Sequence, residues 1–84
     1  MNDMNEIEKL REQIDAVDSE IVKLLNRRIE IVLKIGDQKA AGSLPVEDLS
    51  REEEIISRLK TGNLSYEYLR DIYKVIFKYS KTIQ

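Results

Sequence analysis

Residues 4–41 read MNEIEKLREQIDAVDSEIVKLLNRRIEIVLKIGDQKAA, and this stretch decides the fold. It has no proline, no glycine before Gly36, and many strong helix formers. Apolar residues recur in it at alternating three- and four-residue steps, which is the spacing of one face of an amphipathic helix. The members of this apolar face are Ile7, Leu10, Ile14, Val17, Ile21, Leu24, Ile31 and Ile35. The pattern predicts one long helix from about Met4 to about Ala41.

A helix of this length is more than one small chain can cover. At about 1.5 Å per residue it extends about 57 Å, which is far longer than a compact domain of this size. A second apolar row widens the face in the middle and consists of Val22, Leu25, Ile29 and Val32. We therefore expect a second copy of the chain to cover the rest, in a homodimeric helical bundle.

The remaining sequence predicts two further helices. Pro45 enforces a break, and Ser50 with Glu53 forms a capping-box pattern that predicts a helix from about Arg51 to Lys60. A third helix is expected from a cap at Ser65 to the last residue. The side chains that these two helices should bury are Ile55, Ile56, Leu59, Leu69, Ile72, Tyr73, Ile76, Phe77 and Ile83. No segment alternates like a strand, so we expect an all-α fold with one long, one short and one medium helix, in a single domain over residues 1–84.

The composition excludes several kinds of chemistry. The 84 residues include no cysteine and no histidine, so thiolate nucleophiles, histidine bases and typical zinc sites are ruled out. No motif for metal or phosphate binding is present, and we expect neither a metal nor a cofactor. Fourteen basic and sixteen acidic residues argue against a nucleic-acid partner. No apolar run reaches the length of a signal peptide or a membrane span, so no membrane association and a cytoplasmic location are expected.

Several polar residues lie where apolar ones are expected or cluster near one another. Arg28 occupies the position of the apolar face between Leu24 and Ile31. Because a guanidinium keeps its proton, burying it requires an anion, either from the protein or from a ligand. Lys39 lies about 16 Å further along the same helix and within about 20° of Arg28 around its axis. Both side chains can therefore lean into one pocket.

Other candidates follow later in the chain. Arg51 and Glu52 open the second helix and can fold back toward the same pocket, while Ser80 and Gln84 extend the buried face of the third helix. Each also has an ordinary structural interpretation, such as a helix-end charge, a small residue or a frayed terminus. The glycine at position 36, inside the helical pattern, has two explanations. Either a ligand or helix approaches the backbone closely there, or the helix simply tolerates glycine at a cost of about 1 kcal/mol relative to alanine.

The order of these pieces resembles a known family. Residues 10–18, LREQIDAVD, resemble the opening of the all-helical chorismate mutases. The paired Arg27-Arg28, Lys39 after a glycine, the run PVEDLSRE at 45–52, and Ser80 with Gln84 also resemble that family. The resemblance covers essentially the whole chain and implies two interlocked copies, intertwined in one homodimeric bundle, with two equivalent sites.

The resemblance also implies roles for individual residues. Arg11 and Arg28 would bind the substrate carboxylates, and Lys39 and Gln84 would contact the ether oxygen. Glu52 would accept a hydrogen bond from the ring hydroxyl. Arg28, Lys39 and Gln84 are thus the expected catalytic residues.

The other matching positions would complete the pocket. Asp48 and Arg51 would shape the side formed by the second helix, and Ser80 would assist at a carboxylate. Arg11 and Lys39 are about 42 Å apart on one straight helix, which no small-molecule pocket spans. Arg11 would therefore reach the site from the partner chain.

The activity implied is that of an isomerase, the rearrangement of chorismate to prephenate on the way to phenylalanine and tyrosine. This pericyclic reaction needs no nucleophile, metal or proton shuttle, which suits a chain without cysteine and histidine. An isochorismate pyruvate-lyase is the alternative enzyme, and Glu52 favours the mutase. A non-catalytic helical dimerisation or regulatory module is the alternative outside enzymes, but such a module gains nothing from Arg28 in its apolar face.

Overall fold

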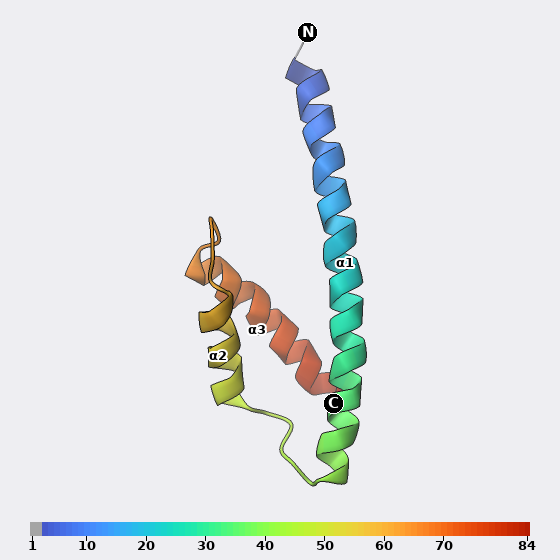
Figure 1. Ribbon diagram of the computed structural model, residues 1–84, viewed down its shortest axis with the longest axis vertical. Helices are drawn as coiled ribbons and strands as arrows, with labels where there is room; N and C mark the ends of the chain where they lie inside the picture. Colours follow the sequence, from blue (N-terminus) through green and yellow to red (C-terminus); the bar gives the residue numbers. More distant parts are fainter. Residues whose placement is uncertain (1–2) are drawn as a thin grey trace. The chain divides into compact units, whose positions relative to one another are not determined.

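The protein, seen in a computed structural model that describes residues 3–84, consists of three helices joined by loops (Figure 1). They are α1 (Asp3–Ala41), α2 (Leu49–Leu59) and α3 (Tyr66–Ile83). The described part of the chain contains no strand, so the predicted all-α class with one long, one short and one medium helix is confirmed. Within residues 3–84, none of the helices has the length and apolar character needed to cross a membrane.

The long helix ends where its sequence predicts. α1 stops at Ala41, and the backbone N–H of Leu44 donates to the carbonyl of Lys39 at 2.8 Å, which satisfies an acceptor of the last turn. The left-handed residue of this turn is Ser43, with φ of 55°, and not the neighbouring Gly42. Pro45 follows shortly after, as is common beyond a helix end.

The predicted start of the short helix is wrong by two residues. α2 begins at Leu49, and its N-cap is Asp48, whose Oδ1 accepts from the N–H of Arg51 at 3.0 Å. The predicted capping box of Ser50 and Glu53 is therefore not the cap. Asp and Ser cap about equally well, so the earlier position is favoured because each added helical residue contributes a backbone hydrogen bond.

The medium helix matches its prediction at the start and nearly so at the end. Ser65 is the N-cap of α3, and its Oγ accepts from the N–H of Tyr68 at 3.1 Å. The helix ends at Ile83, with Gln84 as its C-cap.

The chain divides into two compact units, the first ending at Ile31 and the second covering Val32–Gln84. The first unit is the N-terminal part of α1 by itself. Its share of the apolar face is open to water, with side chains from Ile7 to Leu24 exposed by 45 to 62 %. A contiguous apolar surface of this kind is typical of a protein–protein contact.

The second unit has a small core between α2 and α3. Ile56, Leu69 and Phe77 are buried there, and the ring of Phe77 lies 5.4 Å from that of Tyr73, centroid to centroid. The half-buried residues packed around this core are Ile55, Leu59, Leu64 and Tyr73. Of the positions predicted to be buried in the second helix, Ile56 is buried and Ile55 and Leu59 are half-buried. Ile72, predicted to be buried in the third helix, is exposed.

Gly36 is the point at which the end of α3 meets α1. A Cβ built on Gly36 would lie 2.9 Å from Cα of Gln84 and 3.2 Å from its carbonyl carbon, which are backbone atoms that have little room to move. Of the two interpretations of Gly36, close approach by a helix end is therefore the correct one. The glycine lets the last residue of the chain rest directly on α1.

Gly36→Ala should destabilise the protein although alanine is the better helix former by about 1 kcal/mol. Crowding the Gln84 backbone should lower the free energy of unfolding by about 1–3 kcal/mol. Urea titration followed by circular dichroism measures the change. Gly42→Ala is the matched control, because its Cβ would meet only ordinary contacts at 3.5 Å or more. A Gly36→Ala variant more stable than the natural chain would show that the contact is not rigid.

Candidate active site

The eight residues expected to form the site are divided between the two units. Arg11 and Arg28 lie in the first unit, on α1. The second unit contains the other six, which are Lys39, Asp48, Arg51, Glu52, Ser80 and Gln84.

In the first unit the two arginines have different surroundings. Arg11 lies at the surface, and its Nη1 is 3.8 Å from Oε1 of Glu8, one turn earlier on the same helix. Such an exposed pair contributes little to stability, so the Arg11 side chain is easily redirected toward another anion. Arg28 is partly buried.

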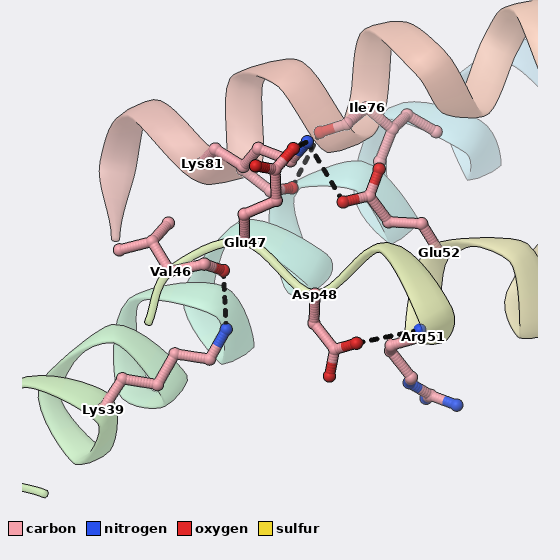
Figure 2. Close-up of polar contacts among 9 residues, drawn as sticks. Lys39, Val46, Glu47, Asp48, Arg51, Glu52, Ile76 and Lys81 are labelled. Carbon is pink, nitrogen blue, oxygen red and sulfur yellow. Dashed lines mark hydrogen bonds and ion pairs between the residues drawn. The ribbon is translucent and has the colours of Figure 1, made fainter. Parts of the chain in front are cut away.

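Lys39 is held at the base of the loop that follows α1. Its Nζ donates to the carbonyl of Val46 at 2.8 Å (Figure 2). It also lines a cavity of about 530 Å³, together with Asp48 and other residues of the segment 44–50. This volume lies in the range of small-molecule sites, and an ammonium has three N–H donors, so Lys39 can serve the cavity while keeping its backbone contact.

Asp48 and Arg51 have structural partners at the start of α2. The Asp48 carboxylate caps the helix through the N–H of Arg51, as described above. The Arg51 guanidinium donates to Oε1 of Glu54 at 2.9 Å, one turn later. Figure 2 shows the Arg51 side chain pointing away from Glu52 and Lys81.

Glu52 belongs to a charged cluster that the sequence did not reveal. Lys81, near the end of α3, places its Nζ 3.1 Å from Oε2 of Glu52 and 2.9 Å from Oε1 of Glu47. Figure 2 shows the ammonium between the two carboxylates. Neither Glu47 nor Lys81 was expected in the site, because a lysine in the last turn of a helix and an acid in a loop are ordinary surface residues. The one feature of the sequence that could have indicated a role for Lys81 is its position directly after Ser80 and three residues before Gln84.

The two carboxylates keep Lys81 charged. The hydrogen bond that Lys81 donates to Glu47, followed by the one it donates to Glu52, raises the pKa of Lys81 above its ordinary value of 10.5, and loss of hydration partly offsets this rise. A raised lysine pKa stabilises the fold at every pH below 10.5, and this contribution is lost only when the pH rises through the folded value. Lys81 is therefore a permanent cation under any physiological condition.

Ser80 and Gln84 face inward, as the sequence predicts. Ser80 is buried, and its hydroxyl donates to the carbonyl of Ile76 at 2.7 Å. Gln84 is half-buried, and within residues 3–84 its Oε1 is buried without a hydrogen-bond partner. Gln84 rests on Gly36, which is one helical turn before Lys39, so the amide and the ammonium belong to the same end of α1.

The second unit thus contains a cation, an amide and a carboxylate that differ in what they offer a ligand. Lys39 offers a charge and N–H donors, and the buried amide of Gln84 gains by forming a hydrogen bond with a ligand. Glu52 offers an acceptor whose charge is partly balanced by Lys81. All of these groups bind or stabilise charge, and none acts as a nucleophile.

A family model for type II chorismate mutases matches residues 10–84. The chain belongs to the type II chorismate mutase family. A solved structure of Helicobacter pylori chorismate mutase in complex with prephenate is similar to it, with a TM-score of 0.83 and 39 % identity over 92 % of this chain and 87 % of the other. A conserved hypothetical protein from Pyrococcus furiosus is also similar, with a TM-score of 0.78 and 36 % identity over 92 % of each chain.

Among curated chorismate mutase relatives, the similarity is confined to part of a longer protein. The bifunctional chorismate mutase/prephenate dehydratase of Aquifex aeolicus is 39 % identical over 74 residues, which cover 88 % of this chain and 19 % of that protein. The bifunctional enzyme of the same name from Escherichia coli strain K12 is 31 % identical over 88 residues, which cover 100 % of this chain and 23 % of that protein. The chain therefore spans about a fifth of the length of these relatives.

Removing the observed cap should matter more than removing the one first predicted. Asp48→Ala should lower the free energy of unfolding by about 1 kcal/mol, because the N–H of Arg51 loses its acceptor. Ser50→Ala should be neutral or slightly stabilising, since Ser50 lies inside the first turn of α2, where alanine is favoured. Thermal unfolding of both variants at equal chain concentration tests this. A larger loss for Ser50→Ala would contradict the assignment of the cap.

Proposed function

We propose that this chain catalyses the rearrangement of chorismate to prephenate, with residues 1–84 acting as one domain. The observation that supports it most is the 39 % identity, over nearly the whole chain, with a relative whose structure holds prephenate. A second support comes from the second unit, which contains Lys39, Glu52, Ser80 and Gln84, because these side chains offer the kinds of donor and acceptor that such a substrate needs.

The reaction takes place within one molecule. An ether C–O bond breaks while a C–C bond forms, and no proton is transferred, so the protein must restrict the substrate to its compact reactive conformer. Arg11 and Arg28 do this by bidentate contact with the two carboxylates, for which the planar guanidinium is suited. Negative charge develops on the ether oxygen as its bond breaks, and preorganised donors lower the barrier there.

Lys39 and Gln84 are the proposed donors to the ether oxygen. The Lys39 ammonium is already fixed by its bond to Val46 and borders a cavity of suitable size, so little reorganisation is needed. The backbone of Gln84 lies against Gly36, and its buried amide oxygen has no hydrogen-bond partner within residues 3–84. Ser80 lies one turn before Gln84 and assists at a carboxylate, while Asp48 and Arg51 form the adjoining wall. No metal or cofactor takes part in this proposal.

Glu52 distinguishes the proposed reaction from that of an isochorismate pyruvate-lyase. A carboxylate placed to accept the ring hydroxyl of chorismate favours the mutase. A non-catalytic dimerisation or regulatory module is the other alternative, and it does not require a fixed lysine, a buried amide and a balanced carboxylate in one unit.

A direct assay tests the proposed activity. Purified chain should consume chorismate, followed by its absorbance, and yield prephenate. Lys39→Ala should lower kcat by about 100-fold or more, the scale for losing a donor to developing charge. The matched control is Lys34→Ala, since Lys34 is an exposed lysine on the same helix. Activity greater on isochorismate than on chorismate would support the lyase instead, and near-normal turnover by Lys39→Ala would refute its role.

We further propose that the partner of this chain is a second copy of itself. The apolar face of α1 is exposed, and the same face of an antiparallel copy related by two-fold symmetry would cover it. In such a dimer Arg11 would complete the site of the other chain, because Arg11 and Lys39 are about 42 Å apart along one helix. A role in phenylalanine and tyrosine biosynthesis and a cytoplasmic location complete the proposal.

A complementation experiment tests the dimer and the trans role of Arg11 together. Arg11→Ala and Lys39→Ala are expected to be nearly inactive alone. After unfolding, equal mixing and refolding, about half of the dimers should be mixed, and one of their two sites should be intact. About a quarter of the natural activity should then return. No recovery from refolded dimers would show that Arg11 does not act in trans, and a folded, active monomer would refute the dimer.

A further inference from the structure

The ammonium of Lys81 joins three segments of the second unit. It reaches from α3 to Glu52 in the first turn of α2 and to Glu47 in the loop between α1 and α2, at 3.1 and 2.9 Å. Other ion pairs, such as Lys23 with Glu20, join residues three positions apart on one helix. The contacts of Lys81 therefore depend on the tertiary fold, not on helical spacing.

The pair of Lys81 with Glu52 is also better shielded than those helical pairs. The side chains of Lys81 and Glu52 are 31 % and 20 % exposed, whereas those of Lys23 and Glu20 are 74 % and 67 % exposed. Less water around a pair strengthens its attraction and restricts its side chains to fewer conformations. The Glu52 carboxylate is thus held in a defined direction.

The charge balance of this cluster bears on substrate binding. Glu47 and Glu52 both touch the same ammonium, so without Lys81 two carboxylates would lie close together where a dianion is to bind. Like charges at this separation repel one another and repel an anionic ligand. Lys81 contacts Oε2 of Glu52, and the carboxylate has a second oxygen with which to accept a hydroxyl.

We propose that Lys81 is a positioning residue of the active site, which aims the Glu52 carboxylate at the ring hydroxyl of the substrate and offsets the charge of Glu47 and Glu52. This rests on the proposed function, in which Glu52 accepts that hydroxyl. Lys81 lies between Ser80 and Gln84 in the last turns of α3, so the same end of this helix carries two substrate-facing residues and the residue that orients a third. Glu47 contributes by holding Lys81 from the loop side.

A double-mutant cycle tests whether Lys81 acts through Glu52. The variants are Lys81→Met, Glu52→Gln and their combination, with kcat and KM measured for chorismate. Lys81→Met alone should lower kcat/KM by about 10- to 100-fold, the scale for a misplaced contact group. In the Glu52→Gln background the same change should alter kcat/KM by no more than about twofold, because the group it orients has already been altered.

Two further variants separate charge from structure. Lys78→Met removes a neighbouring exposed lysine of α3 and should leave kcat/KM unchanged. Lys81→Arg keeps the cation and should recover much of the activity lost in Lys81→Met. Each variant is assayed well below its own unfolding temperature, and Lys81→Gln replaces Lys81→Met if the latter does not fold.

The outcomes distinguish this proposal from the proposed function. A natural chain that turns over chorismate, with a Lys81→Met variant that keeps its kcat/KM, would refute the role of Lys81 alone. Equal losses in both backgrounds, or Lys81→Arg no better than Lys81→Met, would also refute it, because Lys81 would then not act by orienting Glu52 through its charge. A natural chain without mutase activity would refute the proposed function and this inference with it.

Discussion

The contact of the Gln84 backbone with Gly36 is the constraint on which the second unit depends. A side chain of any size at position 36 would overlap Gln84, the C-cap of α3, so this contact exists only because that position is glycine. It joins the end of α3 to the last turns of α1, at a position one helical turn before Lys39. Gln84, one of the two proposed donors to the ether oxygen, can therefore lie against α1 only because residue 36 has no Cβ.

Two lysines of this unit are held by oxygen atoms from other segments of the chain. Lys39 is anchored to a backbone carbonyl, which fixes its position without neutralising it. Glu52, the one acid proposed to face the substrate, shares its charge with Lys81. A carboxylate is needed to bind a hydroxyl group selectively, but a carboxylate without a nearby cation would repel a dianion. Lys81 of α3 supplies that cation.

The chemistry proposed for this family member requires very little of its side chains beyond placement. A rearrangement within one molecule needs no nucleophile and no general base, so a chain without cysteine and histidine is suited to it. The main requirement is instead accurate placement, because arginine, lysine, glutamine and glutamate side chains from different helices must all reach one substrate. In the proposed dimer, the exposed apolar face of α1 would be covered by the second chain, and the N-terminal part of each α1 would contribute to the site of the other chain.

The sequence by itself determined the three helices and the bounds of α1. It also determined the cap of α3 and the inward position of Ser80 and Gln84, because these depend on local periodicity and on capping chemistry within a few residues. The start of α2 differs from the prediction because Asp48 and Ser50 are both good caps, and only the number of backbone hydrogen bonds gained decides between them.

Only the tertiary structure decided the meaning of Gly36 and the partners of Lys81. Gly36 touches a residue 48 positions later, and Lys81 pairs with Glu47, 34 positions earlier. No local pattern encodes contacts over such separations, since they arise only when the helices pack.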